Sequence, residues 1–243
     1  MSPVILVTGG SAGIGRALVH QLHASGARVV TCARDVDALD ALERELPGVH
    51  TVPCDLTSAA ERAALVDAVR AFGAGRLDGL VNNAAIQDCY RFEAGGEDPG
   101  RVEREIALNL VAPIDLAHRL ADDLAGGWVA NISSGLAHIP IGRCPVYAGT
   151  KAGLSHYTAS VREQSPSVRF VDVLLPVVDT RMTAGRDVSK ITPAEAARQI
   201  LAGVDAGSPV VRVGKARLVP ILNWLAPGLL RRVFNRQALP EPA

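Results

Sequence analysis

The stretch VTGGSAGIGRAL, residues 7–18, joins a short apolar run to an amphipathic helical pattern and decides the fold. Its glycines Gly9, Gly13 and Gly15 lie in a GxxxGxG spacing at the turn. Without Cβ atoms the backbone can turn sharply, and the N–H groups at the start of the next helix can face a pyrophosphate. A glycine-rich loop alone could be an ordinary turn, but its place between a first strand and a first helix favours dinucleotide binding.

Outward from this turn, short apolar runs alternate with helical patterns along most of the chain. Strands are expected at residues 3–7, 27–32, 49–54, 77–83, 127–133, 168–176 and 208–214. Helices are expected between them, the longest over residues 101–124. Continuous β-branched runs are typical of parallel strands that helices cover on both faces. We therefore predict the α/β class, with a single doubly wound Rossmann domain over residues 1–214, a mainly parallel sheet and helices on both faces.

The composition excludes several classes of protein. The 243 residues carry no net charge, so no global field favours nucleic acid. The four cysteines show no metal-ligand spacing and are expected to be reduced thiols of an intracellular protein. The N-terminus has no basic region, and no apolar stretch reaches the roughly 18 residues needed to span a bilayer. We expect a cytoplasmic protein without a metal site.

The end of the second strand bears on cofactor choice, since it should lie beside the adenosine ribose. Ala33 and Arg34 stand there, so a guanidinium is available to hold a 2′-phosphate and NADP(H) is favoured. Asp35 keeps NAD(H) open, because it could point back at the ribose. Arg16 could be a second phosphate contact or an exposed helix residue. Asp55 could accept from the adenine amino group or cap the next helix.

Four further motifs follow the glycine turn in order. They are NNAA at residues 82–85, Asn109, NISS at residues 131–134 and YAGTK at residues 147–151. Ser134 precedes Tyr147 by thirteen positions. Together with the turn, these motifs resemble the short-chain dehydrogenase/reductase family over about residues 3–182.

The resemblance implies hydride transfer between the nicotinamide of NADP(H) and a carbonyl or alcohol carbon. Tyr147 would be the general acid in reduction and the base in oxidation. Lys151 lies one helical turn along on the same face, where its charge should lower the tyrosine pKa and its amine should bind the nicotinamide ribose. Ser134 would hold the substrate oxygen, while Ser133 would serve the backbone. Asn109 would complete a proton relay through its main-chain carbonyl and a water.

A proline supplies a physical reason for that last role. Pro113 lies four residues beyond Asn109 and has no N–H to give to the Asn109 carbonyl. The helix is therefore expected to kink there and leave the carbonyl free for a water, although Pro113 could merely bend a surface helix.

The resemblance also assigns contacts with cofactor and substrate. The expected cofactor contacts are Gly9, Ser11, Gly13, Ile14, Gly15, Arg34, Asp55, Leu56, Asn83, Ala84, Tyr147, Lys151, Pro176 and Thr180. The expected substrate pocket consists of Gln87, Asp88, Tyr90, Leu136, His138, Val177 and Met182. His138 is expected in the pocket wall, with a role as an extra acid as the alternative.

Several details of the sequence depart from the family or belong to the region around the pocket. A substrate lid is expected at about residues 183–206, with its mobile part in AGRDVSKITP, residues 184–193. Ala85 and Val177 stand where the family commonly has glycine, and Val177 could narrow the pocket.

The segment 215–243 is expected to be an amphipathic C-terminal extension. Pro220 and Pro227 favour two short helices, and basic residues flank their apolar positions: Lys215, Arg217, Arg231, Arg232 and Arg236. Three roles stay open: packing over the cleft or its own domain, a dimer contact, and peripheral binding to an anionic membrane.

Two alternatives to an NADP(H)-dependent reductase remain. One is an NAD(H)-dependent alcohol dehydrogenase, and the other is a nucleotide-sensing regulator without turnover. Such regulators typically lose the tyrosine or the lysine, and both are present here. The substrate is expected to be a moderately apolar carbonyl compound. A homo-oligomer is expected through helices 101–124 and 146–164.

Overall fold

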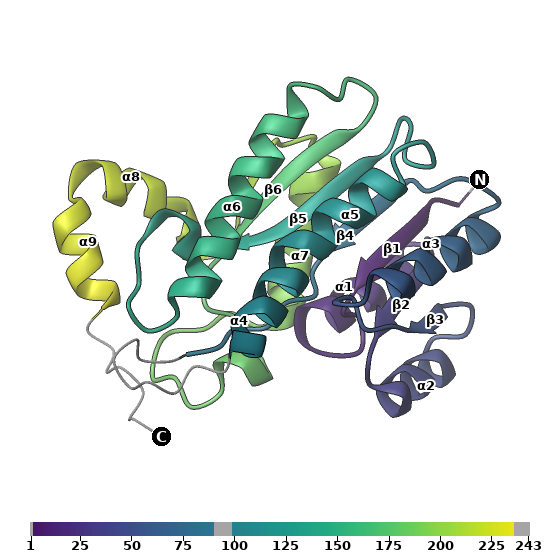
Figure 1. Ribbon diagram of the computed structural model, residues 1–243, viewed down its shortest axis with the longest axis horizontal. Coiled ribbons are helices and arrows are strands. Elements are labelled where there is room, and N and C mark those ends of the chain that lie inside the picture. The colour runs from purple at the N-terminus through teal and green to yellow at the C-terminus, as the bar shows by residue number, and fades with distance from the viewer. Residues whose placement is uncertain (1, 90–98, 236–243) are drawn as a thin grey trace.

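The computed structural model describes residues 2–89 and 99–235 of the chain (Figure 1). Two residues named above, Tyr90 and Arg236, lie outside this range.

Seven parallel strands form one sheet, as the alternating apolar runs predict. In chain order they are β1 (Val4–Thr8), β2 (Arg28–Ala33), β3 (His50–Pro53), β4 (Gly79–Asn82), β5 (Trp128–Ser134), β6 (Arg169–Leu175) and β7 (Val210–Arg212). Their order across the sheet is β3-β2-β1-β4-β5-β6-β7, and every pairing between them is parallel. The order reverses between β1 and β4, the kind of point at which doubly wound sheets bind ligands.

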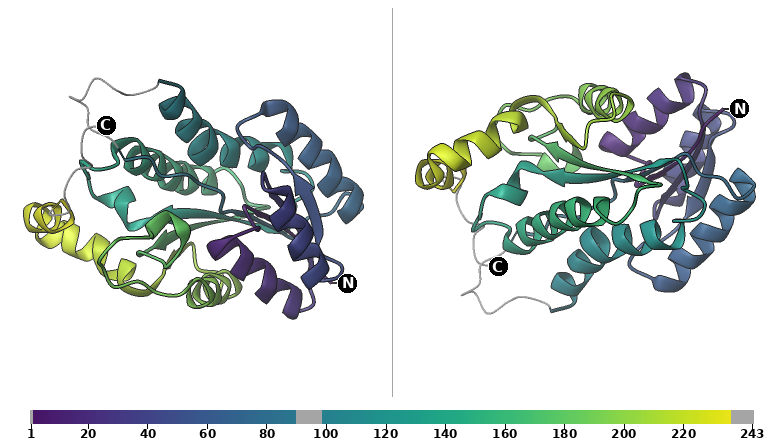
Figure 2. Two further views of the ribbon diagram at one scale, coloured as in Figure 1. Left: turned by 90° about the horizontal axis from the view of Figure 1, so that it is seen from below. Right: turned by 90° about the horizontal axis from the view of Figure 1, so that it is seen from above.

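Helices cover both faces of this sheet (Figure 2). The helices on one face are α1 (Gly13–Ala24), α2 (Val36–Glu45) and α7 (Pro193–Asp205). The helices on the other are α3 (Ala59–Gly73), α4 (Pro99–Ile106), α5 (Ala112–Arg119) and α6 (Pro145–Arg162). Leu18, Leu42 and Ile200 belong to the core under the first layer, and Leu65 and Leu116 to the core under the second. The predicted doubly wound Rossmann architecture is confirmed.

The helix expected over residues 101–124 is interrupted and shorter. A π-helical turn, Ala107–Val111, separates α4 from α5, and the Ala112 N–H donates to the Ala107 carbonyl five residues back. The interruption lies around Asn109 and just before Pro113, where the missing proline N–H predicted a kink. The helix ends at Arg119 and not at Leu124, and turns follow.

The C-terminal extension forms two short helices, as its prolines predict. A 3₁₀ turn, Gly214–Leu218, leads into α8 (Val219–Leu225) and α9 (Pro227–Phe234), which project beyond α6 at one end of the molecule (Figure 1). Val219 and Leu230 form a small apolar cluster with Ile139. Among the described residues, no helix combines the length and apolarity required to cross a membrane.

Candidate active site

The glycine turn packs so closely that side chains cannot enter it. A Cβ on Gly15 would lie 2.1 Å from the Gly9 carbonyl oxygen. Gly13 has a φ of +55° and faces Thr180, whose Cγ2 would be 3.2 Å from a Cβ at that position. The segment after β6 therefore lies against the turn.

The first turn of α1 has the properties of a phosphate site. Its N-cap residue, Ala12, supplies no side-chain acceptor to the helix N–H groups, and no acid lies in the first turn. By contrast, Asp35 caps α2 and Ser58 caps α3. Free N–H groups and the positive end of the helix dipole suit an anion, so the residues present fit the pyrophosphate of a dinucleotide.

The NNAA segment is fixed to this turn by β1. The Thr8 hydroxyl accepts from the N–H groups of Asn83 at 2.9 Å and Ala84 at 3.1 Å, and the Asn83 amide donates to the Thr8 carbonyl at 2.9 Å. Asn82 donates to Asn131 at 2.8 Å across the β4–β5 pair. These bonds hold the ends of β1, β4 and β5 in one frame.

At the adenosine end, Arg34 is exposed and has no hydrogen bond or ion pair with another described residue. Asp35 accepts from the Ala38 N–H at 3.0 Å and so caps α2. Arg16 forms an ion pair with Glu45 on α2.

Asp55 does not cap the next helix, because Ser58 does so through the Glu61 N–H. The Asp55 carboxylate instead accepts from the N–H and the hydroxyl of Thr57. Burial acts to raise the pKa of Asp55, but these bonds and the charge of Arg34 outweigh burial and lower it. A carboxylate and a guanidinium thus lie together where adenosine is expected.

Three predicted residues converge beyond the turn. Tyr147 lies in the first turn of α6, and Ser134, the last residue of β5, is near enough to influence the ionisation of its phenol. The Lys151 Nζ lies 5.7 Å from the centre of the Tyr147 ring. It also donates to the Ile132 carbonyl at 2.7 Å, which fixes it on the sheet. Ser133 bonds to the Lys151 carbonyl at 3.2 Å, a backbone role as predicted.

Burial sets the protonation of this group. Burial raises the pKa of Tyr147 to about 12, and the nearby Ser134 hydroxyl and the Arg186 charge only partly oppose it. Burial also lowers the pKa of Lys151 to about 8, against the charges of Asp172 and Glu105. We expected Lys151 to lower the pKa of Tyr147; in the protein alone the pKa is raised, because an apolar site disfavours both charges.

Asn109 joins α4–α5 to the loop after β4. Its side chain donates to the Ile86 carbonyl at 2.8 Å and accepts from the Ile86 N–H at 3.0 Å. It also donates to the Thr150 hydroxyl on α6 at 3.3 Å. Because the side chain is fully engaged, Asn109 positions the loop that borders Tyr147.

The sequence reasoning missed Glu105, one helical turn before Asn109. Its carboxyl is completely buried; Oε1 accepts from the Asp88 N–H at 3.3 Å, and Oε2 has no hydrogen-bond partner among the described residues. Burial raises its pKa to about 7. Nothing in the charged run VEREI distinguished Glu105 from the exposed Glu103.

Glu105→Gln is expected to stabilise the protein at pH 8. The pKa of Glu105 is about 7 in the folded protein and 4.5 in the unfolded chain. The contribution of this carboxyl to the free energy of unfolding is therefore fully present below pH 4.5 and is lost as the pH rises through 7. The loss amounts to about 3 kcal/mol, and glutamine keeps an acceptor for the Asp88 N–H. Urea unfolding at pH 5 and pH 8 measures the difference, with Glu103→Gln as the exposed control. An equal effect of Glu105→Gln at both values would contradict the prediction.

On the substrate side, Gln87 and Leu136 lie next to the phenol. Leu136 packs on the cluster that contains Tyr147 and Cys144, and the Gln87 amide donates to the Cys144 sulfur at 2.9 Å. Arg186 donates to Gln87 at 2.5 Å, so the segment after β6 reaches the loop after β4.

The remaining predicted pocket residues lie around this edge of the sheet. His138 ends the 3₁₀ turn after Ser134, and Asp88 pairs with Arg101. Met182 accepts from Arg186 through its carbonyl at 3.2 Å, and Val177 accepts from the Ile191 N–H at 3.2 Å.

The expected lid divides into two parts. Residues 193–205 form α7, whose Ala196, Ala197 and Ile200 are buried in the core with α1. A lid therefore remains a prediction for the segment 184–192 alone.

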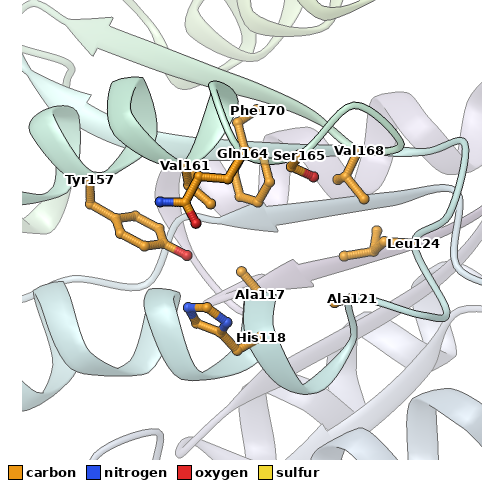
Figure 3. A pocket seen from close by; sticks show the side chains of 10 residues that line it. All are labelled: Ala117, His118, Ala121, Leu124, Tyr157, Val161, Gln164, Ser165, Val168 and Phe170. Carbon is orange, nitrogen blue, oxygen red and sulfur yellow. The ribbon is translucent and has the colours of Figure 1, made fainter.

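A separate hollow lies between α5 and α6, and Tyr147 does not line it (Figure 3). Its lining residues are Ala117, His118, Ala121, Leu124, Tyr157, Val161, Gln164, Ser165, Val168 and Phe170. Because none of the predicted site residues lines it, it is not assigned as the substrate pocket.

A parallel sheet with a glycine turn at its switch point, and a tyrosine, a serine and a lysine beside that turn, define a nucleotide-binding oxidoreductase of the α/β class. A family model described as short chain dehydrogenase matches residues 3–190. The chain belongs to the short-chain dehydrogenase/reductase family, which confirms the resemblance.

Individual relatives agree with this assignment. The chain is 35% identical to the uncharacterized oxidoreductase DltE of Bacillus subtilis (strain 168) over 195 residues, 77% of each protein. It is 38% identical to the L-xylulose reductase of Bos taurus over 178 residues, 71% of this chain and 70% of that protein. A short chain dehydrogenase from Burkholderia cenocepacia J2315, solved in complex with NADP, superposes with a TM-score of 0.84 at 25% identity and covers 96% of this chain and 97% of its own.

Proposed function

We propose that the protein is an NADP(H)-dependent carbonyl reductase or alcohol dehydrogenase that uses Tyr147 as its general acid and base. The observation that carries the proposal is that Tyr147, Ser134 and Lys151 lie together at the carboxyl edge of the sheet that also carries the glycine turn. Bound NADP(H) supplies or accepts the hydride. The expected cofactor and pocket residues stay proposals of the same kind.

In this proposal the chain's own groups hold the substrate oxygen and move its proton. The Ser134 hydroxyl donates to that oxygen, and the Tyr147 O–H gives it a proton during reduction. A phenol with a pKa of about 12 gives up its proton reluctantly, so Lys151 must be protonated to stabilise the phenolate. Asn109 keeps the bordering loop in place.

The cofactor preference rests on Arg34. Arg34 is exposed and without a bonded partner among the described residues, while Asp35 is engaged as a helix cap. Arg34→Asp is expected to weaken NADPH binding by about 1.5 kcal/mol, roughly tenfold, and to favour NADH, because a carboxylate repels the 2′-phosphate. Fluorescence titration with both nucleotides measures the change. Arg44→Asp, elsewhere on the exposed surface, is the control. If Arg34→Asp leaves the ratio of the NADPH and NADH affinities unchanged, the assignment of Arg34 is wrong.

A broad carbonyl and alcohol screen, followed through NADPH absorbance, tests turnover itself. Turnover with any carbonyl compound separates the proposal from a nucleotide-sensing regulator, which would bind NADPH and leave every compound unchanged. Preferred use of NADH with alcohols would instead support the NAD(H)-dependent dehydrogenase.

We also propose that segment 184–192 closes over the substrate. Arg186 already bonds to Gln87 across the mouth of the site. Hydrogen exchange in this segment should slow when NADPH and a substrate are bound, and exchange that does not change would argue against a lid.

A homo-oligomer is proposed through the outer face of α4, α5 and α6. Ile106 and Val111 are exposed there at 38% and 44%, and the hollow of Figure 3 lies on the same layer. Apolar side chains on an outer helical face are typical of subunit contacts. Light scattering that returns the mass of a single chain would contradict this proposal.

For the C-terminal helices we propose contact with an anionic lipid surface. Val219 and Leu230 pack on Ile139, but six other large apolar side chains of α8 and α9 stay exposed: Ile221, Leu222, Trp224, Leu225, Leu229 and Val233, with Trp224 at 81%. Residues 206–240 contain six basic residues and no acid. A two-fold contact between copies would bring identical basic surfaces together, whereas anionic lipid complements them.

Pelleting with phosphatidylglycerol-containing vesicles tests this contact. The full chain should pellet at low salt and not with phosphatidylcholine alone. Arg231→Gln/Arg232→Gln should weaken binding by about 2 kcal/mol, because each basic residue near the surface contributes about 1 kcal/mol. Arg198→Gln on α7 is the control. Absence of pelleting would contradict the lipid contact. A dimer that Trp224→Ala dissociates would show that a second copy of the chain covers this surface instead.

A further inference from the structure

Two cysteines far apart in sequence meet beside Tyr147. Cys144 directly precedes α6, is buried, and packs with Ile141, Tyr147 and Ala148. Cys89 comes from the loop after β4, is half-buried, and packs on the same cluster. Both cysteines thus belong to one small cluster beside the Tyr147 ring. The fold therefore places a partly accessible thiol against an inaccessible one at the edge of the site.

The surroundings divide the two thiols into a thiolate and a thiol. The neighbouring Cys144 thiol and the guanidinium of Arg143, with the charge of Arg186, lower the pKa of Cys89 to about 6 despite its burial. The proximity of Cys89 and burial raise the pKa of Cys144 far above its ordinary value. At neutral pH Cys89 is therefore the thiolate and Cys144 the protonated thiol, the arrangement that peroxides oxidise selectively.

We propose that Cys89 and Cys144 form an oxidisable dithiol that reacts with hydrogen peroxide to give a disulfide beside the active site. The Cys89 thiolate attacks one peroxide oxygen, the O–O bond breaks, a sulfenic acid forms, and the departing hydroxide takes up a proton from solvent as water. The Cys144 sulfur then attacks the Cys89 sulfur, the S–O bond breaks, and the departing hydroxide takes up the Cys144 proton as water. Two electrons pass from the thiol pair to the peroxide, which is reduced to two waters.

The disulfide would act on the neighbouring polar contacts. Gln87 donates to the Cys144 sulfur at 2.9 Å and accepts from Arg186 at 2.5 Å. These two bonds connect Cys144, three residues before Tyr147, to segment 184–192. A disulfide draws the Cys144 sulfur toward Cys89 and removes the acceptor that Gln87 uses, so turnover should fall. This effect on turnover rests on the proposed function, whereas the oxidation itself does not.

The chain contains its own control pair. Cys32 and Cys54 also lie in one cluster, but they are 0% and 4% exposed in the core that α3 covers. Peroxide cannot reach them in the folded protein. If two neighbouring thiols were sufficient, both pairs would oxidise, and if access decides, only the Cys89–Cys144 pair does.

Peroxide treatment of the full chain, followed by intact mass and non-reducing peptide mapping, tests the proposal. Free thiols should fall from four to two, with a Cys89–Cys144 peptide that dithiothreitol cleaves. Cys144→Ser should stop at a sulfenic acid on Cys89 that dimedone traps, and Cys89→Ser should slow the reaction by about tenfold or more. Cys32→Ser/Cys54→Ser should react like the wild type.

Four titratable thiols after treatment of the wild type, or a disulfide through Cys32 or Cys54, would overturn the proposal. These readouts need no substrate, so they stand even if the carbonyl screen finds no turnover. If turnover is found, oxidation should lower it in the wild type and dithiothreitol should restore it. Oxidation should leave the turnover of Cys89→Ser unchanged.

Discussion

Tyr147→Phe is expected to lower kcat for carbonyl reduction by about 10²–10⁴-fold while NADPH binding stays near the wild-type level. The substitution removes the O–H that would protonate the substrate oxygen. The phenylalanine ring keeps the packing against Ile141, Cys144 and Ala148, so the fold should persist. Steady-state kinetics on the compound that the screen identifies, with a parallel NADPH titration, measure the two effects separately.

Tyr157→Phe on the same helix is the matched control. The Tyr157 hydroxyl is buried without a hydrogen-bond partner among the described residues, and the ring lies at the hollow between α5 and α6. Its removal should leave kcat unchanged and the stability equal or slightly higher, because an unsatisfied buried hydroxyl is costly. A folded Tyr147→Phe variant with wild-type turnover would mean that another group supplies the proton.

The elements and the reacting residues follow from local patterns. Apolar period and glycine position predict a strand, a turn and a helix at the N-terminus, and parallel pairing brings the ends of β1, β4 and β5 to one edge. Tyr147 and Lys151 share a helix face because they are four residues apart. The missing N–H of Pro113 likewise predicted an interruption, which the structure shows as a π-helical turn around Asn109.

The parts that escaped prediction depend on contacts between distant segments. The bond from Arg186 to Gln87 spans 99 positions, and that from Gln87 to Cys144 spans 57. No local pattern records such an approach. The pKa of Tyr147 depends on how completely the site is buried, and the burial of Glu105 depends on which side of α4 meets the loop after β4. Sequence periodicity predicts a helix and its apolar face, but not a carboxyl enclosed by a loop.

Gly15→Ala is expected to weaken NADPH binding and to lower the thermal stability together. The new methyl would lie 2.1 Å from the Gly9 carbonyl oxygen and 2.5 Å from the Asn83 amide nitrogen. Backbone cannot yield as a flexible side chain can, so α1 must move away from the turn that presents its N–H groups. Such overpacking costs about 1–3 kcal/mol, which corresponds to as much as a hundredfold in affinity if the strained turn must be restored on binding.

Gly149→Ala, within the motif YAGTK, is the matched control, because a methyl group at this position has room. A Cβ there would meet nothing within 4 Å, and the residue is an exposed position of α6. Alanine should therefore raise stability by about 0.5–1 kcal/mol and leave binding unchanged. Calorimetric titration with NADPH and thermal unfolding of both variants make the comparison. If Gly15→Ala binds NADPH as tightly as Gly149→Ala and unfolds at the wild-type temperature, the dinucleotide does not lie on this turn and every contact proposed from it must be withdrawn.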